Sequence, residues 1–250
     1  MKIEDSIAVV TGANRGLGKA LVNSLLKAGA AKVYACARDP LQIAEGDRIV
    51  PIRLDITSAE QVNAAACGCS DADLLFNNAG ILRDCSVLGD GAEDALRAEL
   101  EVNVFGTLRM LRAFAPVLAR RSRSAIANIL SVTSLVTYPF NATYAASKHA
   151  ALALTDGARV QLRAQNTLVL AVFAGYIDTD MAASFTGAKT PTLQVAERAL
   201  TGIKNGSNQV FADERAAAAW KATRTDPTEI QATMQRYWDA SLSARNNVPT

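Results

Sequence analysis

Tyr144 and Lys148 stand four residues apart in a segment with helical periodicity, Thr143–Gln165. This spacing places both side chains on one face of a helix. The pKa of a phenol is ordinarily about 10, and a neighbouring ammonium group favours the phenolate and so lowers that pKa. The pair therefore has the composition of a proton donor and acceptor. Of the five tyrosines in the chain, only Tyr144 has a lysine at this offset.

Ser131 lies thirteen residues before Tyr144, at the C-terminal end of a predicted strand. Open parallel sheets bind their ligands at this end of the strands, so the Ser131 hydroxyl is placed to orient and polarise a carbonyl group. A tyrosine with a lysine four residues on also arises by chance, and a serine at a strand end is ordinary turn chemistry. The three residues therefore need support from the rest of the chain.

A glycine turn follows the first predicted strand. The stretch "VVTGANRGLGKAL" spaces Gly12, Gly16 and Gly18 as G-x-x-x-G-x-G at the start of a predicted helix. Glycines in this position let the chain turn sharply and let a pyrophosphate approach the backbone, where the free N–H groups of the helix start face the anion. Glycines can also serve turn geometry alone, but the position after strand one favours a dinucleotide site.

The second predicted strand ends in "VYACARDP", with Ala37 where many dinucleotide-binding chains carry an acid and Arg38 directly after it. An acid at this position accepts hydrogen bonds from a ribose 2′-hydroxyl, whereas an arginine pairs with a 2′-phosphate. Arg15 in the glycine turn is a second cation that can reach the same phosphate. The pattern predicts NADP(H) rather than NAD(H). The alternative is a surface pair of Arg38 with Asp39 and a solvated Arg15.

The elements that must position these residues alternate between short apolar runs and longer helical patterns. This alternation predicts an α/β fold, a doubly wound parallel sheet of the Rossmann-like type. No linker or repeat divides the chain, so we expect a single domain over residues 1–250. The expected strands are Ile7–Thr11, Lys32–Ala37, Ile49–Leu54, Asp73–Asn77, Ala125–Leu130, Thr167–Phe173 and Gln209–Phe211, and the helices are Gly16–Ala28, Ala59–Cys67, Glu93–Arg120, Thr143–Gln165, Thr192–Lys204 and two more after Phe211.

Composition narrows the function classes. The chain has 250 residues with 26 basic and 24 acidic side chains, and neither sign forms a long block, so we expect no nucleic-acid partner and no membrane partner. No apolar run has the length of a membrane span and no leader pattern opens the chain, which predicts a cytoplasmic protein. The four cysteines have no C-x-x-C spacing and His149 is the only histidine, so we expect no metal site.

Two further motifs occur in the order and spacing of one family. They are "NNAG", Asn77–Gly80, and Asn103 within "EVNVFG"; with "TGANRGLG", Ser131 and "YAASK", they make the chain resemble a compact short-chain dehydrogenase/reductase over nearly its whole length. Three positions depart from the family pattern: Leu130 replaces a frequent serine, Ser134 a frequent glycine and Ala174 a usual proline. These departures affect the expected shape of the substrate loops.

The resemblance implies a role for each matching residue. Tyr144 would be the general acid or base, Lys148 would lower its pKa and hold the nicotinamide ribose, Ser131 would bind the substrate oxygen, and Asn103 would anchor a water in a proton relay behind the lysine. The expected catalytic set is thus Asn103, Ser131, Tyr144 and Lys148. The expected cofactor contacts are Gly12, Asn14, Arg15, Gly16, Leu17, Gly18, Arg38, Asp55, Ile56, Asn78, Ala79, Gly80, Tyr144, Lys148, Gly175, Ile177 and Thr179.

The resulting hypothesis is an NADP(H)-dependent reductase of ketones or aldehydes. The alternatives are an NADP-linked secondary-alcohol dehydrogenase, a non-catalytic NADP(H) sensor, and a nucleotide-sugar epimerase or dehydratase, which would normally need a larger C-terminal domain. We expect a homodimer or homotetramer with a small-molecule substrate.

Trp220, Tyr237 and Trp238 in the terminal helices have three possible roles: they fill the core, cover the active site or contact a neighbouring subunit. The expected walls of the substrate pocket are Ile81, Leu82, Thr133–Asn141, Tyr176, Met181 and Phe185.

Overall fold

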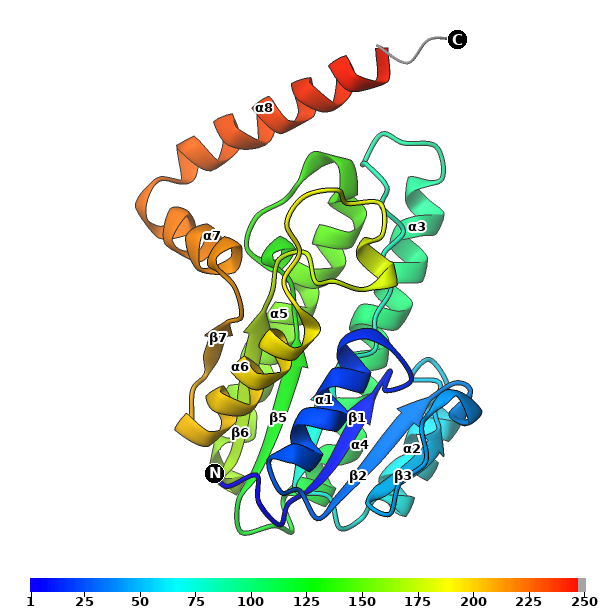
Figure 1. The fold of residues 1–250 in the computed structure, drawn as a ribbon. Helices are drawn as coiled ribbons and strands as arrows, with labels where there is room; N and C mark the ends of the chain where they lie inside the picture. The colour runs from blue at the N-terminus through cyan, green and yellow to red at the C-terminus, as the bar shows by residue number, and fades with distance from the viewer. Residues whose placement is uncertain (247–250) are drawn as a thin grey trace.

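One parallel sheet of seven strands forms the centre of the molecule, in the order β3-β2-β1-β4-β5-β6-β7 (Figure 1). The structure is a computed structural model that describes residues 1–246, with residues 241–246 described as helical backbone only. The strands are β1 Ile7–Thr11, β2 Lys32–Ala37, β3 Ile49–Arg53, β4 Leu74–Asn77, β5 Ser124–Ile129, β6 Thr167–Phe173 and β7 Gln209–Phe211. All seven predicted strands are present, and Leu54, Asp73 and Leu130 fall just outside them.

The strand order reverses between β1 and β4, because the chain first builds outward through β2 and β3 and then returns to the other side of β1. Such a reversal leaves a crevice beyond the carboxyl ends of the two central strands, since the connections on either side lead away from it. The fold is therefore a single Rossmann-like α/β domain, as predicted, over the described residues. The last four residues of the predicted domain, 247–250, lie outside that range.

The described chain contains eight α-helices, and five of them cover the faces of the sheet. Helices α1 and α6 pack on one face, and α2, α4 and α5 cover the other (Figure 1). Their apolar faces meet the strands in two buried clusters, since a parallel sheet covered on both sides presents apolar residues to both. The helices are α1 Gly16–Lys27, α2 Ala59–Gly68, α3 Ala92–Glu99, α4 Thr107–Leu118, α5 Ala142–Gln161, α6 Thr192–Asn205, α7 Glu214–Thr225 and α8 Pro227–Asn246.

The predicted helical stretch Glu93–Arg120 is helical from Ala92 to Leu118, but it is not α-helical throughout. Helices α3 and α4 are joined by a π-helical segment, Leu100–Gly106. Gly106 ends that segment where the backbone passes Ile56, and a Cβ there would lie 2.6 Å from Ile56 Cδ1. Apolar periodicity cannot distinguish a π-helical insertion from a continuous helix, because both leave the same face buried. The predicted helix Thr143–Gln165 likewise ends at Gln161, and a 3₁₀ turn covers Arg163–Gln165.

The C-terminal helices cover different parts of the molecule. Trp220 on α7 packs against Phe173 and Phe211, with ring centroids 6.4 and 5.3 Å away, and so covers the β6–β7 edge of the sheet. Tyr237 on α8 meets Tyr138 with ring centroids 5.8 Å apart. Helix α8 crosses the end of the molecule where the carboxyl ends of the strands lie (Figure 1). No helix in the described chain combines the length and apolar composition needed to cross a bilayer.

Candidate active site

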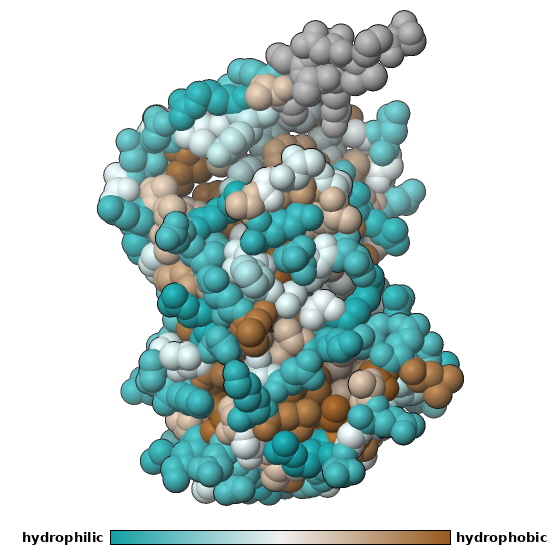
Figure 2. Space-filling view, in the orientation of Figure 1, coloured by the Kyte–Doolittle hydropathy of each residue, from teal (hydrophilic) through white to brown (hydrophobic). Residues whose placement is uncertain are grey.

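A cavity of about 530 Å³ opens at the carboxyl ends of the strands, at the point where the strand order reverses. Its walls come from the glycine turn, the ends of β2 and β3, the loop after β4, the end of β5, the start of α5 and the segment after β6. The outline of the molecule narrows between the sheet and the segments above it, on a face that is mostly hydrophilic (Figure 2). All seventeen residues expected to contact a cofactor line this cavity, and so does Ser131.

The glycine turn leaves no space for side chains. Gly12 and Gly16 have positive φ angles of 64° and 53°, which L-residues with a Cβ rarely adopt. A Cβ on Gly18 would lie 1.9 Å from the carbonyl oxygen of Gly12, so only glycine fits there. Arg15 precedes α1 without a capping side-chain hydrogen bond, and the first turn of α1 contains no acidic residue. The helix start therefore presents its N–H groups and its positive dipole end to the cavity.

The loop after β4 is attached to this turn by side-chain hydrogen bonds. The Thr11 hydroxyl accepts from the backbone N–H groups of Asn78 and Ala79, both at 3.0 Å. The Asn78 side-chain amide donates to the carbonyl oxygens of Thr11 at 2.9 Å and Gly12 at 3.2 Å. Asn78 lines the cavity as predicted, but its amide nitrogen is engaged by the turn. Its main contribution in this structure is to fix the shape of the glycine turn.

Arg38 lies exposed at the end of β2, beside the cavity. The alternative of a surface pair with Asp39 is not observed, because the Asp39 carboxylate accepts from the Leu41 N–H at 3.2 Å and the Gln42 amide at 3.0 Å. Among the described residues, no carboxylate lies within ion-pair distance of the Arg38 guanidinium. Burial of the Asp55 carboxyl would raise its pKa, but hydrogen bonds from Thr57 and, to a smaller extent, the charge of Arg38 hold that pKa below its usual value.

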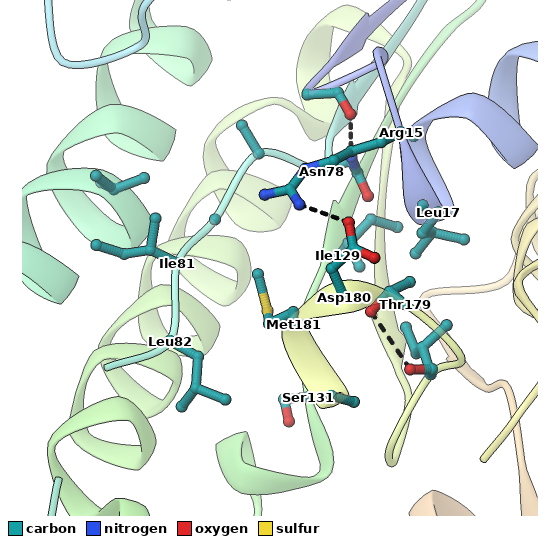
Figure 3. A pocket seen from close by; sticks show the side chains of 18 of the residues that line it. Arg15, Leu17, Asn78, Ile81, Leu82, Ile129, Ser131, Thr179, Asp180 and Met181 are labelled. Atoms are coloured by element: carbon teal, nitrogen blue, oxygen red, sulfur yellow. Dashed lines mark hydrogen bonds and ion pairs between the residues drawn. The ribbon is translucent and has the colours of Figure 1, made fainter. Parts of the chain in front are cut away.

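Arg15 does have a partner. Its guanidinium forms an ion pair of 2.6 Å with Asp180, which lies in the segment after β6 on the opposite wall of the cavity (Figure 3). Both side chains are largely exposed. The prediction of a solvated or phosphate-facing Arg15 is therefore incomplete, since Asp180 occupies the guanidinium. No local sequence signal indicated Asp180, because the pair joins residues 165 positions apart.

Ser131, Tyr144 and Lys148 come together in the cavity, as predicted. Ser131 lies two residues after the end of β5, and its side chain hydrogen-bonds the Tyr144 phenol. Lys148 is buried, with its Nζ 5.7 Å from the Tyr144 ring centroid and donating to the Ile129 carbonyl oxygen at 3.1 Å. The phenol, the hydroxyl and the ammonium group thus belong to one site, although they come from two separate elements.

Burial dominates the proton affinities of this site. It raises the pKa of Tyr144 well above its usual value, although the hydrogen bond with Ser131 acts in the opposite direction, and the charge of Glu99 raises the pKa further. Burial also lowers the pKa of Lys148 to about 8. The prediction that Lys148 lowers the pKa of Tyr144 does not describe this structure, because removal from water is the main cause of both shifts and Lys148 is not among the causes that act on Tyr144.

Asn103 does not line the cavity. It is buried in the π-helical segment, where its Oδ1 accepts from Ile81 N–H at 2.9 Å and its Nδ2 donates to the Ile81 carbonyl at 2.9 Å and the Ser147 hydroxyl at 3.0 Å. A Cβ on Gly80 would lie 3.1 Å from Asn103 Oδ1 and 3.7 Å from Lys148 Nζ, so Asn103 is close to the lysine as expected. Its observed hydrogen bonds hold the loop after β4.

Two of the three departures from the family pattern, Leu130 and Ser134, have local structural roles. Leu130 is buried against Ala171 and Phe173. Ser134 accepts a hydrogen bond from the Ser131 N–H at 3.3 Å, while the Ser131 hydroxyl accepts from Thr133 N–H at 3.1 Å. These two bonds fix the turn that carries Ser131, which glycine at position 134 could not do in the same way.

The other end of the cavity is largely apolar. Ile81, Leu82, Tyr138, Tyr176 and Met181 line it, as predicted, and Ile81, Leu82 and Met181 are seen around the opening in Figure 3. Of the predicted range Thr133–Asn141 only Thr133, Tyr138 and Asn141 line the cavity, and the predicted wall residues Phe140 and Phe185 do not. Phe185 instead stacks on the Tyr176 ring with centroids 3.6 Å apart, and Phe140 stacks on Tyr138 at 5.7 Å. Both rings support wall residues from behind.

Comparison with known proteins agrees with the dinucleotide-binding geometry of this cavity. The family model described as short chain dehydrogenase matches residues 6–190. A crystal structure of a short chain dehydrogenase from Burkholderia cenocepacia J2315, in complex with NADP, is 40% identical, has a TM-score of 0.91, and covers 94% of this chain and 99% of its own.

Two curated relatives are more distant. The 1-deoxy-11-beta-hydroxypentalenate dehydrogenase of Streptomyces exfoliatus is 30% identical over 90% of this chain and 82% of its own length. The Dehydrogenase/reductase SDR family member 7B of Rattus norvegicus is also 30% identical, over 72% of this chain, but the match spans only 60% of the rat protein.

Proposed function

Because the chain belongs to the short-chain dehydrogenase/reductase family, we propose that it reduces a ketone or aldehyde to an alcohol with NADPH, by reversible hydride transfer. The observation that carries the proposal is the geometry of the cavity. Ser131, Tyr144 and Lys148 lie in the same cavity as a glycine turn and the Arg38 guanidinium. A carbonyl substrate and a dinucleotide would thus meet beside a proton donor.

The structure fits a dinucleotide at the glycine turn. Gly18 leaves no space for a Cβ, and the start of α1 offers uncapped N–H groups, as a pyrophosphate requires. In our proposal Asp55 accepts from the adenine amino group, Lys148 holds the nicotinamide ribose, and Ile177 with Thr179 meets the carboxamide. When bound, NADPH supplies the hydride.

NADP(H) is favoured over NAD(H) by the charges at the end of β2. Ala37 supplies no acid to accept from a 2′-hydroxyl, and the Asp39 carboxylate is engaged with the backbone and side chain of its own turn. Arg38 is thus the group best placed to pair with a 2′-phosphate. The similar structure from Burkholderia cenocepacia J2315 was solved in complex with NADP, which supports the same assignment here.

Tyr144 acts as the general acid in this proposal. Because burial raises the pKa of its phenol, Tyr144 holds its proton at neutral pH and can donate it to the carbonyl oxygen as the hydride arrives at carbon. Ser131, which hydrogen-bonds the phenol, is placed to hold the same oxygen. A protonated phenol suits reduction, whereas oxidation of an alcohol requires the phenolate.

The test is a cofactor assay with purified protein. NADPH or NADH is incubated with a panel of ketones, aldehydes and quinones, and the absorbance of the reduced cofactor is followed. We expect turnover with NADPH in preference to NADH. Binding of NADPH without turnover of any carbonyl on a broad panel would contradict the proposal and favour a sensor, and a preference for NADH would contradict the role of Arg38.

We also propose that the protein is a homodimer or homotetramer. Phe105, in the π-helical segment, and Val160, on α5, are 49% and 76% exposed on helical segments that pack together, where a second subunit would cover them. Light scattering coupled to size-exclusion chromatography measures the mass directly. A monomer at micromolar concentration would contradict this proposal and leave the enzymatic one unaffected.

A further inference from the structure

The segment that follows β4 carries one wall of the substrate end of the cavity. Ile81 and Leu82 line the cavity, and the segment that contains them runs beside helices (Figure 3). It has no regular secondary structure of its own, so its position depends on hydrogen bonds from its neighbours. The groups that hold this segment therefore decide where a substrate meets the wall.

Alternate residues of the segment are held by side chains of the flanking helices. Asn103 holds both backbone groups of Ile81. Two residues on, the Arg83 N–H donates to Glu99 Oε1 at 2.8 Å. Two residues further, the Cys85 carbonyl accepts from the Thr143 N–H at 3.3 Å and hydroxyl at 3.2 Å.

Glu99 is the least expected of these anchors. It ends α3 four residues before Asn103, so both side chains leave the same face of the helical run. Its side chain is fully buried, and its Oε2 has no hydrogen-bond partner among the described residues. Burying a carboxyl group in this way is costly, so a purely structural position would more readily carry an apolar residue.

Glu99 is also close to the reacting groups. Its charge acts on the Tyr144 phenol, and its carboxyl is near Thr143, the residue before Tyr144. The other charged groups that act on Glu99 are Arg83 and Asp84, both from the segment itself. Glu99 therefore lies between the pocket wall and the helix that carries the proton donor.

Resting on the proposed reductase function, we propose that Glu99 is a positioning residue: its carboxyl oxygen holds the Ile81–Cys85 segment at a fixed distance from α5, so that the substrate carbonyl meets Tyr144 and Ser131. In this proposal the side chain of Glu99 must be long enough for its oxygen to accept a hydrogen bond from the Arg83 N–H. The cofactor end of the cavity, formed by the glycine turn and Arg38, does not depend on it.

Two substitutions distinguish the length of the Glu99 side chain from its negative charge. Glu99→Gln keeps the acceptor oxygen at the same distance and removes the charge, whereas Glu99→Asp keeps the charge and shortens the side chain by one methylene group. We expect Glu99→Asp to raise the KM for the carbonyl substrate by about tenfold, because small misplacements of a substrate are costly to reaction. The KM for NADPH should stay within about twofold of the wild-type value, and Glu99→Gln should resemble wild type in both constants.

The matched control is Glu101→Asp, two residues along the same helical run, where the side chain is partly exposed and paired with Arg109 at 2.7 Å. This variant should leave both KM values unchanged. The positioning role of Glu99 is overturned if Glu99→Asp leaves the KM for the carbonyl substrate unchanged or raises the KM values for substrate and NADPH equally. It is also overturned if Glu99→Asp lowers only kcat, which is the result that a loss of folded enzyme would produce. It is also overturned if Glu99→Gln raises the substrate KM as much as Glu99→Asp.

Amide hydrogen exchange tests the same contact without turnover. The Arg83 N–H should be protected in the wild type and in Glu99→Gln and exchange faster in Glu99→Asp, because its acceptor is then out of reach. Equal exchange in all three proteins would overturn the inference. If the wild type reduces no carbonyl, the proposed function fails on the cofactor assay, while this measurement still decides whether Glu99 holds the segment.

Discussion

The guanidinium of Arg15 and the carboxylate of Asp180 form a 2.6 Å ion pair that joins the glycine turn to the segment after β6 across the cavity. Arg15 follows β1 and Asp180 follows β6, so both lie beyond the carboxyl ends of the parallel strands. A cofactor phosphate that uses Arg15 must compete with Asp180 for the same guanidinium. The ion pair therefore opposes binding of the ligand that the rest of the cavity favours.

Asp180→Asn should tighten NADPH binding. The substitution frees the Arg15 guanidinium and removes a negative charge from the cavity wall, so affinity should rise by about two- to fivefold at low salt, the size of effect that an exposed ion pair usually has. The gain should be larger for NADPH than for NADH and should decrease with added salt. Titration calorimetry measures both affinities.

The control for Asp180→Asn is Asp178→Asn, an exposed acid two residues away that forms no ion pair among the described residues. It removes the same charge without freeing Arg15. Weaker NADPH binding by Asp180→Asn, or an equal gain from Asp178→Asn, would show that Arg15 is not the group in competition.

Arg38→Leu should reverse the cofactor preference. Arg38 has no carboxylate partner among the described residues, so its removal leaves no unpaired acid behind. Loss of a charge-assisted hydrogen bond to a 2′-phosphate should raise the KM for NADPH by about tenfold or more. The KM for NADH should change by less than about twofold by the same reasoning, since NADH has no phosphate there.

The ratio of kcat/KM for the two cofactors is the measurement for Arg38→Leu. Lys27→Leu, at the far end of α1, removes a positive charge of similar exposure away from the cavity and should leave the ratio unchanged. An unchanged ratio in Arg38→Leu would assign the phosphate to another residue, such as Arg15.

Tyr144→Phe should abolish most of the activity and preserve cofactor binding. The ring and its packing stay, but the proton donor is removed, so kcat should fall by about 10²- to 10⁴-fold. NADPH affinity, measured by fluorescence titration, should stay near the wild-type value. Tyr34→Phe removes a phenol bonded to Lys32 and Asp71 at the other end of the sheet and should retain full activity. Substantial turnover by Tyr144→Phe would mean that another group donates the proton.

Lys148→Met should inactivate the enzyme and stabilise its fold at neutral pH. Burial lowers the pKa of Lys148 from 10.5 to about 8. Between these values the unfolded chain binds more protons than the folded chain, so wild-type stability rises with pH over this window and is lowest below pH 8. A pKa difference of this size corresponds to about 3 kcal/mol, of which about 1 kcal/mol is offset by leaving the Ile129 carbonyl without its donor.

Urea unfolding at pH 7 and at pH 10 measures the effect of Lys148→Met. The variant should be more stable than wild type at pH 7, and the difference should shrink at pH 10. Lys32→Met is the opposite case, because a hydrogen bond with Asp71 raises the pKa of Lys32, so that variant should be less stable than wild type. Equal destabilisation by both substitutions at pH 7 would show that the Lys148 cation is not costly to bury.

Local patterns predicted the elements of this protein well. The strands Ile7–Thr11, Lys32–Ala37 and Thr167–Phe173 have the predicted bounds, because apolar runs bounded by turn residues are local signals. The glycine turn and the Tyr144–Lys148 pair were also predicted, since each depends on spacing within one short segment. The π-helical segment Leu100–Gly106 was not predicted, because it leaves the apolar periodicity unchanged.

The sequence by itself indicated the fold class, the Tyr144–Lys148 pair and the position of the glycine turn. The fold class follows from the alternation of apolar runs and helical patterns along the chain, and the other two follow from spacing within one short segment. Only the tertiary structure decided that Asp180 holds Arg15, that Glu99 holds Arg83, and that Asn103 faces Ile81 rather than the cavity. It also decided the proton affinities of Tyr144 and Lys148. Each of these depends on burial or on contact between distant segments, and neither quantity is encoded in local spacing.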